Sequence, residues 1–306
     1  MRRKKRSALT GFVLALLLLT GTTGVVAQQP ESWSRPSSVV GENYYHYVAA
    51  GETLIELARD AGVGYGALIQ ANPDIDPWQP PVGAEILIPR AAVVPYPAQP
   101  GITVNLAEQR LYLIQQGDNE RFIRSYPIGI GREGNDTPTG QYRVVTMIAN
   151  PSWTPPSSVR AEQPDIPGVV PPGPDNPLGD YWIGLSAHSI GLHGTNRPYG
   201  IGRQVSSGCI RLYPEHISIL FRRVDIGMPV TIIDLPIKLG HLDGRLYLEA
   251  HPDRDNKVTA PLTEILRQRD LIAPDVQIDW QQVRLVLDQR KGVPHPVSVF
   301  TVPAEQ

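Results

Sequence analysis

Cys209 is the only cysteine among the 306 residues, and its surroundings suit nucleophilic chemistry. It stands in the run Ser206-Ser207-Gly208-Cys209-Ile210-Arg211, 16 positions after His193. A thiol attacks as its thiolate, and a neighbouring imidazole and the start of a following helix would both favour that form. Gly208 permits a sharp turn that can present backbone N–H groups to an oxyanion. The sequence therefore predicts a catalytic Cys209 thiolate with the His193 imidazole near it, and a buried, inert thiol is the alternative.

The other histidines lack this glycine-rich setting, and we assign them solvated or structural roles. They are His46, His188, His216, His241, His251 and His295. No histidine or carboxylate pair has the spacing of metal ligands, and a single cysteine excludes both a disulfide framework and a Cys-rich zinc site. We therefore expect no metal and no cofactor.

A β-rich region of the chain contains both reactive residues. Alternating apolar residues predict its strands, and turns rich in Gly and Pro separate them. The expected strands are 102–106, 111–114, 122–130, 141–148 and 230–233. One helix is expected over 214–224, because Pro214 suits a first helical turn and apolar residues recur at helical spacing after it.

Two stretches outside these elements differ in character. Residues 150–180 hold nine prolines, and a loop of this length is typical of a lid or a binding loop. The tail from residue 235 onward shows no chemistry, so it is either an added packing layer or a docking surface. Its expected elements are a hairpin over 240–250 and helices near 262–269 and 281–289.

Residues 101–234 resemble the L,D-transpeptidase catalytic domain, the YkuD-type fold, in its ErfK/YbiS-like group. The motifs that carry the resemblance follow the family's order. They are Tyr126–Gly131, Thr137–Gly140, Pro171–Gly179, Leu192–Asn196 and Ser206–Leu212. The resemblance implies a mainly β domain, sandwich- or barrel-like, with one short helix after the cysteine.

The same resemblance implies a mechanism on peptidoglycan. Cys209, deprotonated by His193, attacks the carbonyl at the L-centre of meso-diaminopimelate in a tetrapeptide stem; D-alanine leaves and a thioester remains. An amine then takes the acyl group, either from a second stem or from the lysine of an outer-membrane lipoprotein. The family orients its histidine with a backbone carbonyl, here that of Gly194. Carbapenems are the implied covalent inhibitors.

Three further residues are expected to form the oxyanion site or to position the substrate: Gly208, Ser207 and Arg211. Many family members carry a histidine where Ser207 stands. A serine hydroxyl can donate a hydrogen bond but cannot carry charge at neutral pH. The sequence therefore does not assign the hydrogen-bond donors of the oxyanion site. Arg211 could hold the substrate or brace the turn, and a packing salt bridge is an equal alternative.

Residues 45–89 resemble a LysM domain, with the order strand, helix, helix, strand and a capping-box spacing at Thr53-x-x-Glu56. The matching residues are Tyr47-Val48, Gly51–Leu54, Ala58, Leu68, Asn72-Pro73, Gly83 and Ile86–Pro89. The family binds glycans that contain N-acetylglucosamine, and the implied contacts are Gly51, Thr53, Leu54 and Asn72. A small spacer without a ligand is the alternative.

The first 27 residues predict an export signal. Five basic residues at 2–6 precede an apolar run over 12–19, and Val25-Val26-Ala27 offers small residues for cleavage before Gln28. The run is too short to span a bilayer, and an uncleaved anchor is the alternative. Cleavage leaves 23 of the 28 basic residues against 30 acidic ones, a net charge of about −7, which suits no nucleic-acid partner. We expect a periplasmic, peptidoglycan-associated protein.

The predicted organisation has five parts. They are a signal peptide (1–27), a LysM-like glycan-binding domain (45–89), a semi-rigid linker (90–100), a catalytic domain (101–234) and a C-terminal extension (235–306). The leading function is a peptidoglycan L,D-transpeptidase. One alternative is an L,D-carboxypeptidase, in which water is the acceptor. The other is a non-catalytic peptidoglycan-binding envelope protein, in which the thiol is inert. A papain-like peptidase is disfavoured, because there the cysteine precedes the histidine.

Overall fold

The computed structural model describes residues 38–118, 120–187, 190–253, 265, 268, 272 and 276–299. All of these belong to one compact unit, which spans 35–306. The predicted signal peptide, His188 and most of the predicted helix near 262–269 lie outside the described residues. Among the described residues, no helix combines the length and the apolar character needed to cross a bilayer.

The largest sheet within the described residues has eight strands, in the order β13-β11-β10-β9-β14-β5-β6-β7. Their bounds are β5 Gly101–Asn105, β6 Arg110–Gln116, β7 Arg121–Pro127, β9 Gly140–Ala149, β10 Tyr181–Leu185, β11 Gly191–His193, β13 Ile210–Arg211 and β14 Pro229–Ile233. Pairs β14/β5 and β11/β13 are parallel, and the other neighbours are antiparallel. The predicted mainly β region is therefore confirmed as a large mixed sheet.

Local sequence explains the hairpin β5–β6 and the helix α4, Pro214–Phe221. The turn between β5 and β6 places Gln109 at φ 52°, a left-handed conformation that closes the hairpin. Pro214 occupies the first helical turn of α4, as predicted, because its missing N–H has no helical partner there. The helix ends three residues earlier than predicted, and its apolar side packs into the sheet's core through Ile217 and Leu220.

The proline-rich stretch 150–180 has a defined shape. It contains a short helix, α3 (Ser157–Glu162), and a bridge between Trp153 and Val170. Asn176 is fully buried and donates a hydrogen bond to the Pro151 carbonyl at 2.8 Å. Side-chain bonds to loop carbonyls thus replace the strand ladder that prolines cannot form.

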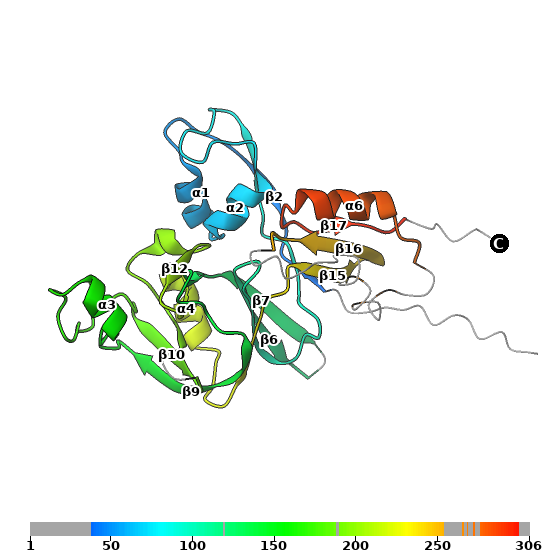
Figure 1. The fold of residues 1–306 in the computed structure, drawn as a ribbon. Helices are drawn as coiled ribbons and strands as arrows, with labels where there is room; N and C mark the ends of the chain where they lie inside the picture. The colour runs from blue at the N-terminus through cyan, green and yellow to red at the C-terminus, as the bar shows by residue number, and fades with distance from the viewer. Residues whose placement is uncertain are drawn as a thin grey trace, which may run out of the picture. The chain divides into compact units, whose positions relative to one another are not determined.

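The N-terminal segment has the predicted order of elements, and Figure 1 shows it in blue and cyan. Its elements are β2 Tyr44–Tyr47, α1 Leu54–Ala61, α2 Tyr65–Ala71 and β3 Glu85–Ile88. The predicted capping box is present: Thr53 accepts from the Glu56 N–H, and the Glu56 carboxylate accepts from the Thr53 N–H. Leu54, Leu68 and Ile86 centre its core.

The first half of the predicted linker 90–100 is packed. Ala92–Val93 forms β4, which pairs with β1 (Val39–Val40), and both residues of β4 are fully buried. Proline content did not reveal this strand, because the apolar run ahead of the prolines finds its partner far away in the chain. Residues 96, 97, 99 and 100 are exposed.

In the described part of the tail, three strands form a second sheet with its own apolar core. Its elements are β15 Ile237–Leu242, β16 Arg245–Ala250, β17 His295–Pro296 and the helix α6 Trp280–Gln289. Figure 1 shows α6 lying along this sheet. The predicted hairpin and the second predicted helix are confirmed, and the tail is a packing layer.

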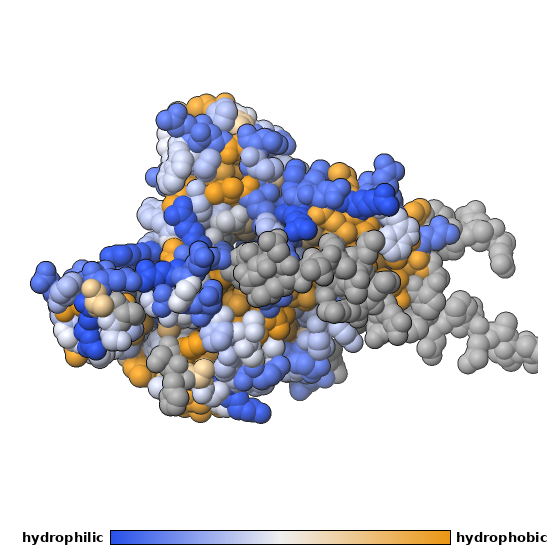
Figure 2. Space-filling model, in the orientation of Figure 1, coloured by the Kyte–Doolittle hydropathy of each residue, from blue (hydrophilic) through white to orange (hydrophobic). Residues whose placement is uncertain are grey.

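Short elements complete the neighbourhood of Cys209. They are β8 Ile130–Gly131, η1 Pro198–Gly200 and β12 Gln204–Ser206. Strands β8 and β12 pair in parallel, with Ser206 opposite Gly131. On the face shown in Figure 2, hydrophobic residues form separate patches between hydrophilic ones.

Candidate active site

Three adjacent strands bring the predicted reactive residues together. In the antiparallel pair β10/β11, Trp182 stands opposite His193, and in the parallel pair β11/β13, His193 stands opposite Arg211. Side chains on neighbouring strands in register share one face of a sheet. Trp182, His193 and Arg211 therefore form a row across the sheet.

The neighbouring positions confirm which face this is. Ile183, Leu192 and Ile210 are also in register with one another, and all three are fully buried in the core beneath α4. Because alternate residues point to opposite faces, the row containing His193 lies on the sheet's other face. Cys209 directly precedes Ile210 and falls on that face as well.

A backbone hydrogen bond fixes the state of the His193 ring. His193 Nδ1 lies 2.7 Å from the carbonyl oxygen of Gly194, as the family resemblance implied. A carbonyl only accepts, so Nδ1 carries the proton and Nε2 is left as the acceptor of the neutral ring. This is the tautomer that a general base requires at Nε2.

The surroundings of His193 oppose its protonation. Its side chain is 4% exposed, and burial together with the guanidinium of Arg211 lowers its pKa to about 3. Hydrogen bonds to the carbonyls of Gly194 and Leu178 act in the opposite direction but are weaker. At neutral pH the imidazole is uncharged.

Ser206 organises the turn that carries the thiol. Its Oγ accepts a hydrogen bond from the Gly208 N–H at 3.2 Å and donates one to the Cys209 carbonyl at 2.5 Å. Gly208 has φ +102°, where a side chain would strain the backbone, so glycine is required at this turn. The sequence analysis placed Ser206 only within a motif and missed this bracing role.

Thr137 clamps the same turn from a different loop. Its buried hydroxyl donates to the Gly208 carbonyl at 2.9 Å and accepts from the Gly131 N–H at 3.0 Å. The Thr137–Gly140 motif therefore supports the nucleophile turn. Its position in the family's motif was the signal that could have identified it.

Burial raises the pKa of the Cys209 thiol, while a hydrogen bond from the Gly191 backbone and the charge of Arg211 lower it less strongly. The predicted contribution of a helix start is not found, because β13 and two further residues separate Cys209 from α4. A backbone N–H group and the Arg211 guanidinium, rather than a helix start, are the groups that lower the pKa of the thiol.

The remaining predicted site residues differ in their availability. Ser207 is exposed beside the turn, whereas the Gly208 N–H is already engaged by Ser206, so Gly208 serves the turn rather than an oxyanion. Arg211 lies beside Cys209, and its buried Nε has no hydrogen-bond partner among the described residues. That donor is available to an anionic ligand.

A second polar cluster, Glu108–Lys238–Glu249–His251, lies outside this site. Lys238 Nζ lies 2.7 Å from a Glu108 oxygen and 3.0 Å from a Glu249 oxygen, and His251 Nε2 lies 2.6 Å from the same Glu249 oxygen. The carboxylates and His251 are grouped closely enough to ligate a metal, but the Lys238 ammonium already bonds both carboxylates. No local pattern predicts this cluster, because Glu108 and Lys238 are 130 residues apart along the chain.

The predicted glycan contacts of the N-terminal segment are largely internal. Leu54 has no exposed surface, and the Asn72 side chain bonds the Leu68 and Leu87 backbones. Thr53 caps α1, while Gly51 lies in an open turn at φ +87°. Motif residues that hold the fold together were thus mistaken for ligand contacts at Leu54 and Asn72.

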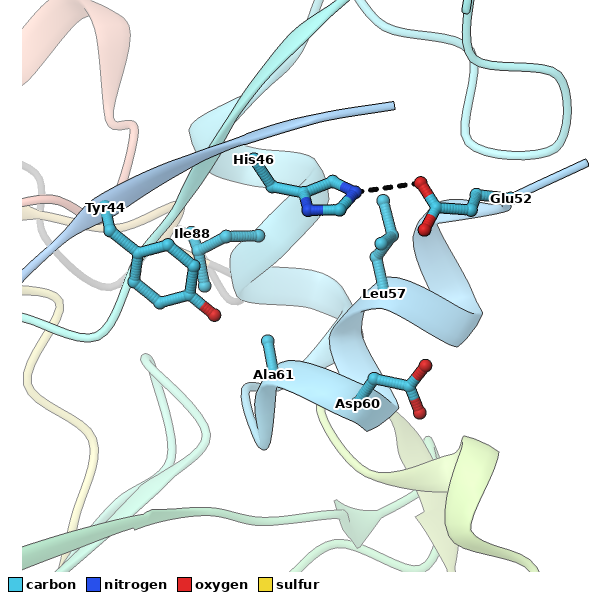
Figure 3. A pocket seen from close by; sticks show the side chains of 7 residues that line it. All are labelled: Tyr44, His46, Glu52, Leu57, Asp60, Ala61 and Ile88. Carbon is cyan, nitrogen blue, oxygen red and sulfur yellow. Dashed lines mark hydrogen bonds and ion pairs between the residues drawn. The ribbon is translucent and has the colours of Figure 1, made fainter. Parts of the chain in front are cut away.

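A cavity of about 220 Å³ lies elsewhere on the same segment. Its lining is Tyr44, His46, Glu52, Leu57, Asp60, Ala61 and Ile88. Figure 3 shows Tyr44 on one side and Glu52 and Asp60 on the other, with His46 Nε2 2.8 Å from the Glu52 carboxylate. An apolar floor rimmed by hydroxyl and carboxylate groups suits a polar ligand with a flat apolar face.

Comparison with known proteins agrees with the geometry around Cys209. The model of the L,D-transpeptidase catalytic domain, YkuD, matches residues 99–232. The Probable L,D-transpeptidase YcfS of Escherichia coli is 39% identical over 294 residues, 89% of this chain and 91% of that protein. The chain belongs to the L,D-transpeptidase family. It is therefore an enzyme of that family.

Two further likenesses accompany this assignment. The Probable L,D-transpeptidase YbiS of Escherichia coli is 38% identical over 223 residues, 70% of this L,D-transpeptidase and 72% of the relative. The solved catalytic domain of an Enterococcus faecium L,D-transpeptidase superposes with a TM-score of 0.35 at 21% identity, over 45% of this chain and 100% of that one. The family assignment rests on the sequence relatives.

Proposed function

We propose that this family member is a peptidoglycan L,D-transpeptidase in which Cys209 is the nucleophile and His193 the base. The observation that carries the proposal is the register of β11 with β13, which places both residues on one sheet face with the imidazole in its Nδ1–H tautomer. Arg211 adds a cation beside the thiol.

The resting site holds a neutral thiol and a neutral imidazole, since burial raises one pKa and lowers the other. His193 Nε2 accepts the thiol proton as sulfur attacks the L-centre carbonyl of meso-diaminopimelate in a tetrapeptide stem. The carbon–nitrogen bond to D-alanine then breaks, and the imidazolium returns the proton to the leaving amine. A thioester on Cys209 remains.

The acceptor is an amine, from a second stem peptide or a lipoprotein lysine. It attacks the thioester carbonyl while His193 takes its proton, and the thiol of Cys209 is released. Arg211 Nε, buried and unpartnered among the described residues, is placed to hold a carboxylate of the donor stem.

We propose further that residues 45–89 form a LysM domain that binds peptidoglycan glycan, and that residues 1–27 direct export to the periplasm. The cavity beside Tyr44, rather than the internal Leu54 and Asn72, supplies the groups for a sugar: a ring face, a hydroxyl and carboxylates. Tyr44→Ala should lower sacculus binding in a pull-down assay without changing thermal stability, whereas unchanged binding would exclude this cavity.

Mass spectrometry of the purified protein with diaminopimelate-containing tetrapeptide muropeptides tests the reaction, with Cys209→Ala as the control. Cross-linked dimers or amine adducts that require the thiol support transpeptidation and identify the acceptor. Tripeptides alone indicate an L,D-carboxypeptidase. Sacculus binding without any turnover indicates the non-catalytic binding protein.

Carbapenems provide a second test of the thiol. They should acylate Cys209 and raise the intact mass of the protein by one adduct, and Cys209→Ala should stay unmodified. An unchanged mass of the wild-type protein after incubation would contradict an activated thiol.

A further inference from the structure

The indole of Trp182 lies on the same sheet face as His193, on the side of β11 away from β13. It stacks on the His193 ring, with centroids 5.9 Å apart and an angle of 26° between the planes. Trp182 stands opposite His193 on β10, so the stack spans two hydrogen-bonded strands. No sequence motif pointed to this tryptophan.

Two glycines admit the indole to that face. Gly184 and Gly191 are in register with each other, two pairs along from Trp182 and His193 and therefore on the same face. A Cβ on Gly184 would lie 2.9 Å from Trp182 Nε1, and a Cβ on Gly191 would lie 2.6 Å from its six-membered ring. Real Cβ atoms do not approach so closely, so any other residue at either position would displace the indole.

Gly191 contacts both the indole and the thiol. Its backbone hydrogen-bonds Cys209, and the Trp182 ring lies against the same glycine. A flat, rigid ring held there restricts how far the imidazole can turn and excludes water from one of its faces.

We propose that Trp182 is a positioning residue that holds the His193 ring in its Nδ1–H tautomer and shields it from water. The indole holds the plane of the imidazole, and in that plane Nδ1 meets the Gly194 carbonyl. The effect on catalysis rests on the proposed role of His193 as the base. The effect on the tautomer and orientation of the ring is independent of that role.

The other groups around His193 leave this role to Trp182. Arg211 of β13 and the preceding Cys209 share its face, and Arg197 acts on Arg211. The loop before β10 supplies the Leu178 carbonyl. Among the described residues, the aromatic ring that stacks on His193 is that of Trp182, and no carboxylate is paired with His193.

Imidazole ¹⁵N NMR of the histidine-labelled protein tests the proposal, with the His193 signals assigned by their loss in His193→Gln. The wild-type ring should remain in the Nδ1–H tautomer without titrating between pH 5 and pH 8. In Trp182→Leu both tautomers should appear, and titration should move into this range. Trp182→Phe should restore the wild-type spectrum, because it keeps an aromatic face.

Gly184→Ala disturbs the indole without altering it and should reproduce the effect of Trp182→Leu in weaker form. Its matched control is Gly168→Ala, because a Cβ there meets nothing within 4 Å. Trp280→Phe, at an exposed tryptophan, is the control for tryptophan loss. Both controls should leave the His193 signals unchanged.

Turnover supplies the functional measurement. Trp182→Leu should lower kcat about 10- to 100-fold with KM little changed, because a mispositioned base loses less than the roughly 100- to 10,000-fold that general-base catalysis contributes. Unchanged His193 signals in both Trp182→Leu and Gly184→Ala would overturn the proposal. A changed ring with wild-type kcat would overturn its catalytic consequence, and a held ring in a wild-type protein without turnover would overturn the proposed function alone.

Discussion

His193 and His251 are each 4% exposed, but they are buried in opposite electrostatic surroundings. His251 pairs with the Glu249 carboxylate, which also bonds the Lys238 ammonium. His193 has backbone carbonyls, an indole and the cation Arg211 around it. The first surroundings balance charge and stabilise the fold, whereas the second leave a neutral ring with a free acceptor.

The difference extends to the partners of each histidine. Burial raises the pKa of Glu249, but Lys238 and the hydrogen bond from His251 outweigh it and hold that pKa at about 2. At the other site burial outweighs the nearby charge. Arg211 lowers the pKa of the thiol only in part and lowers the pKa of His193 further, so the thiol and the imidazole both stay neutral. A buried histidine thus signals reactivity when its charge is left unbalanced.

Replacing His193 or His251 singly with glutamine should give the largest difference between the catalytic and the structural histidine. His193→Gln should lower muropeptide turnover about 100- to 10,000-fold, because the proton acceptor is lost. His251→Gln should keep turnover near the wild-type value and lower stability by about 1–3 kcal/mol, because a buried partner of Glu249 is changed. Turnover and thermal unfolding of both variants check this, and equal losses of turnover would remove the distinction.

Loss of the Lys238 ammonium should lower the stability of the protein more than any substitution near Cys209. Lys238→Met leaves Glu108 and Glu249 buried without their ammonium partner and should cost about 3–5 kcal/mol. Urea unfolding measures the difference. The double variant with Glu249→Gln should recover part of it; no recovery would show that packing, not charge, is responsible.

Acid should destabilise the protein through His193 first. The unfolded chain binds a proton on this histidine near pH 6.5 and the folded protein near pH 3, so stability falls as pH decreases through this window, by about 1.4 kcal/mol per unit. The pKa of Glu249 is depressed from its ordinary value of 4.5, so this carboxylate adds to the loss of stability only when the pH falls below about 4.5. Urea unfolding at pH 5, 6 and 7 should therefore give a shallower slope in His193→Gln than in the wild type, and equal slopes would contradict the lowered pKa.

The smallest expected effect concerns the nucleophile turn. Ser206→Ala removes the two hydrogen bonds that brace Gly208 and Cys209, and should lower kcat about tenfold and stability by about 1 kcal/mol. Ser207→Ala, at the exposed neighbour, is the control and should be near wild type in stability. A larger loss of turnover in Ser207→Ala would give Ser207 the role in the site that its place in the motif suggested.

Local patterns predicted what local physics determines. The capping box at Thr53, the hairpin from Gly101 to Gln116 and the helix that starts at Pro214 each depend on neighbours within a few residues. Cys209 and His193 were found because their glycine-rich settings are short motifs. These features need no knowledge of the tertiary fold.

Features that depend on distant contacts were missed or wrong. Strands β11 and β13 have three and two residues, too few for any periodicity to show. The stack of Trp182 on His193, the bracing by Thr137 and the partners of Glu108 all require the sheet order or the tail. The strand β4 within the linker predicted over 90–100 was missed for the same reason, because β4 forms by pairing with β1.

The buried thiol has a consequence for the protein's chemical lifetime. Oxidants and disulfides react with the thiolate, and burial raises the pKa of the Cys209 thiol, so little of it is ionised between catalytic events. A protein with one cysteine has no second thiol of its own to rescue an oxidised sulfur. Keeping the sulfur protonated until a substrate arrives protects an irreplaceable atom from oxidants.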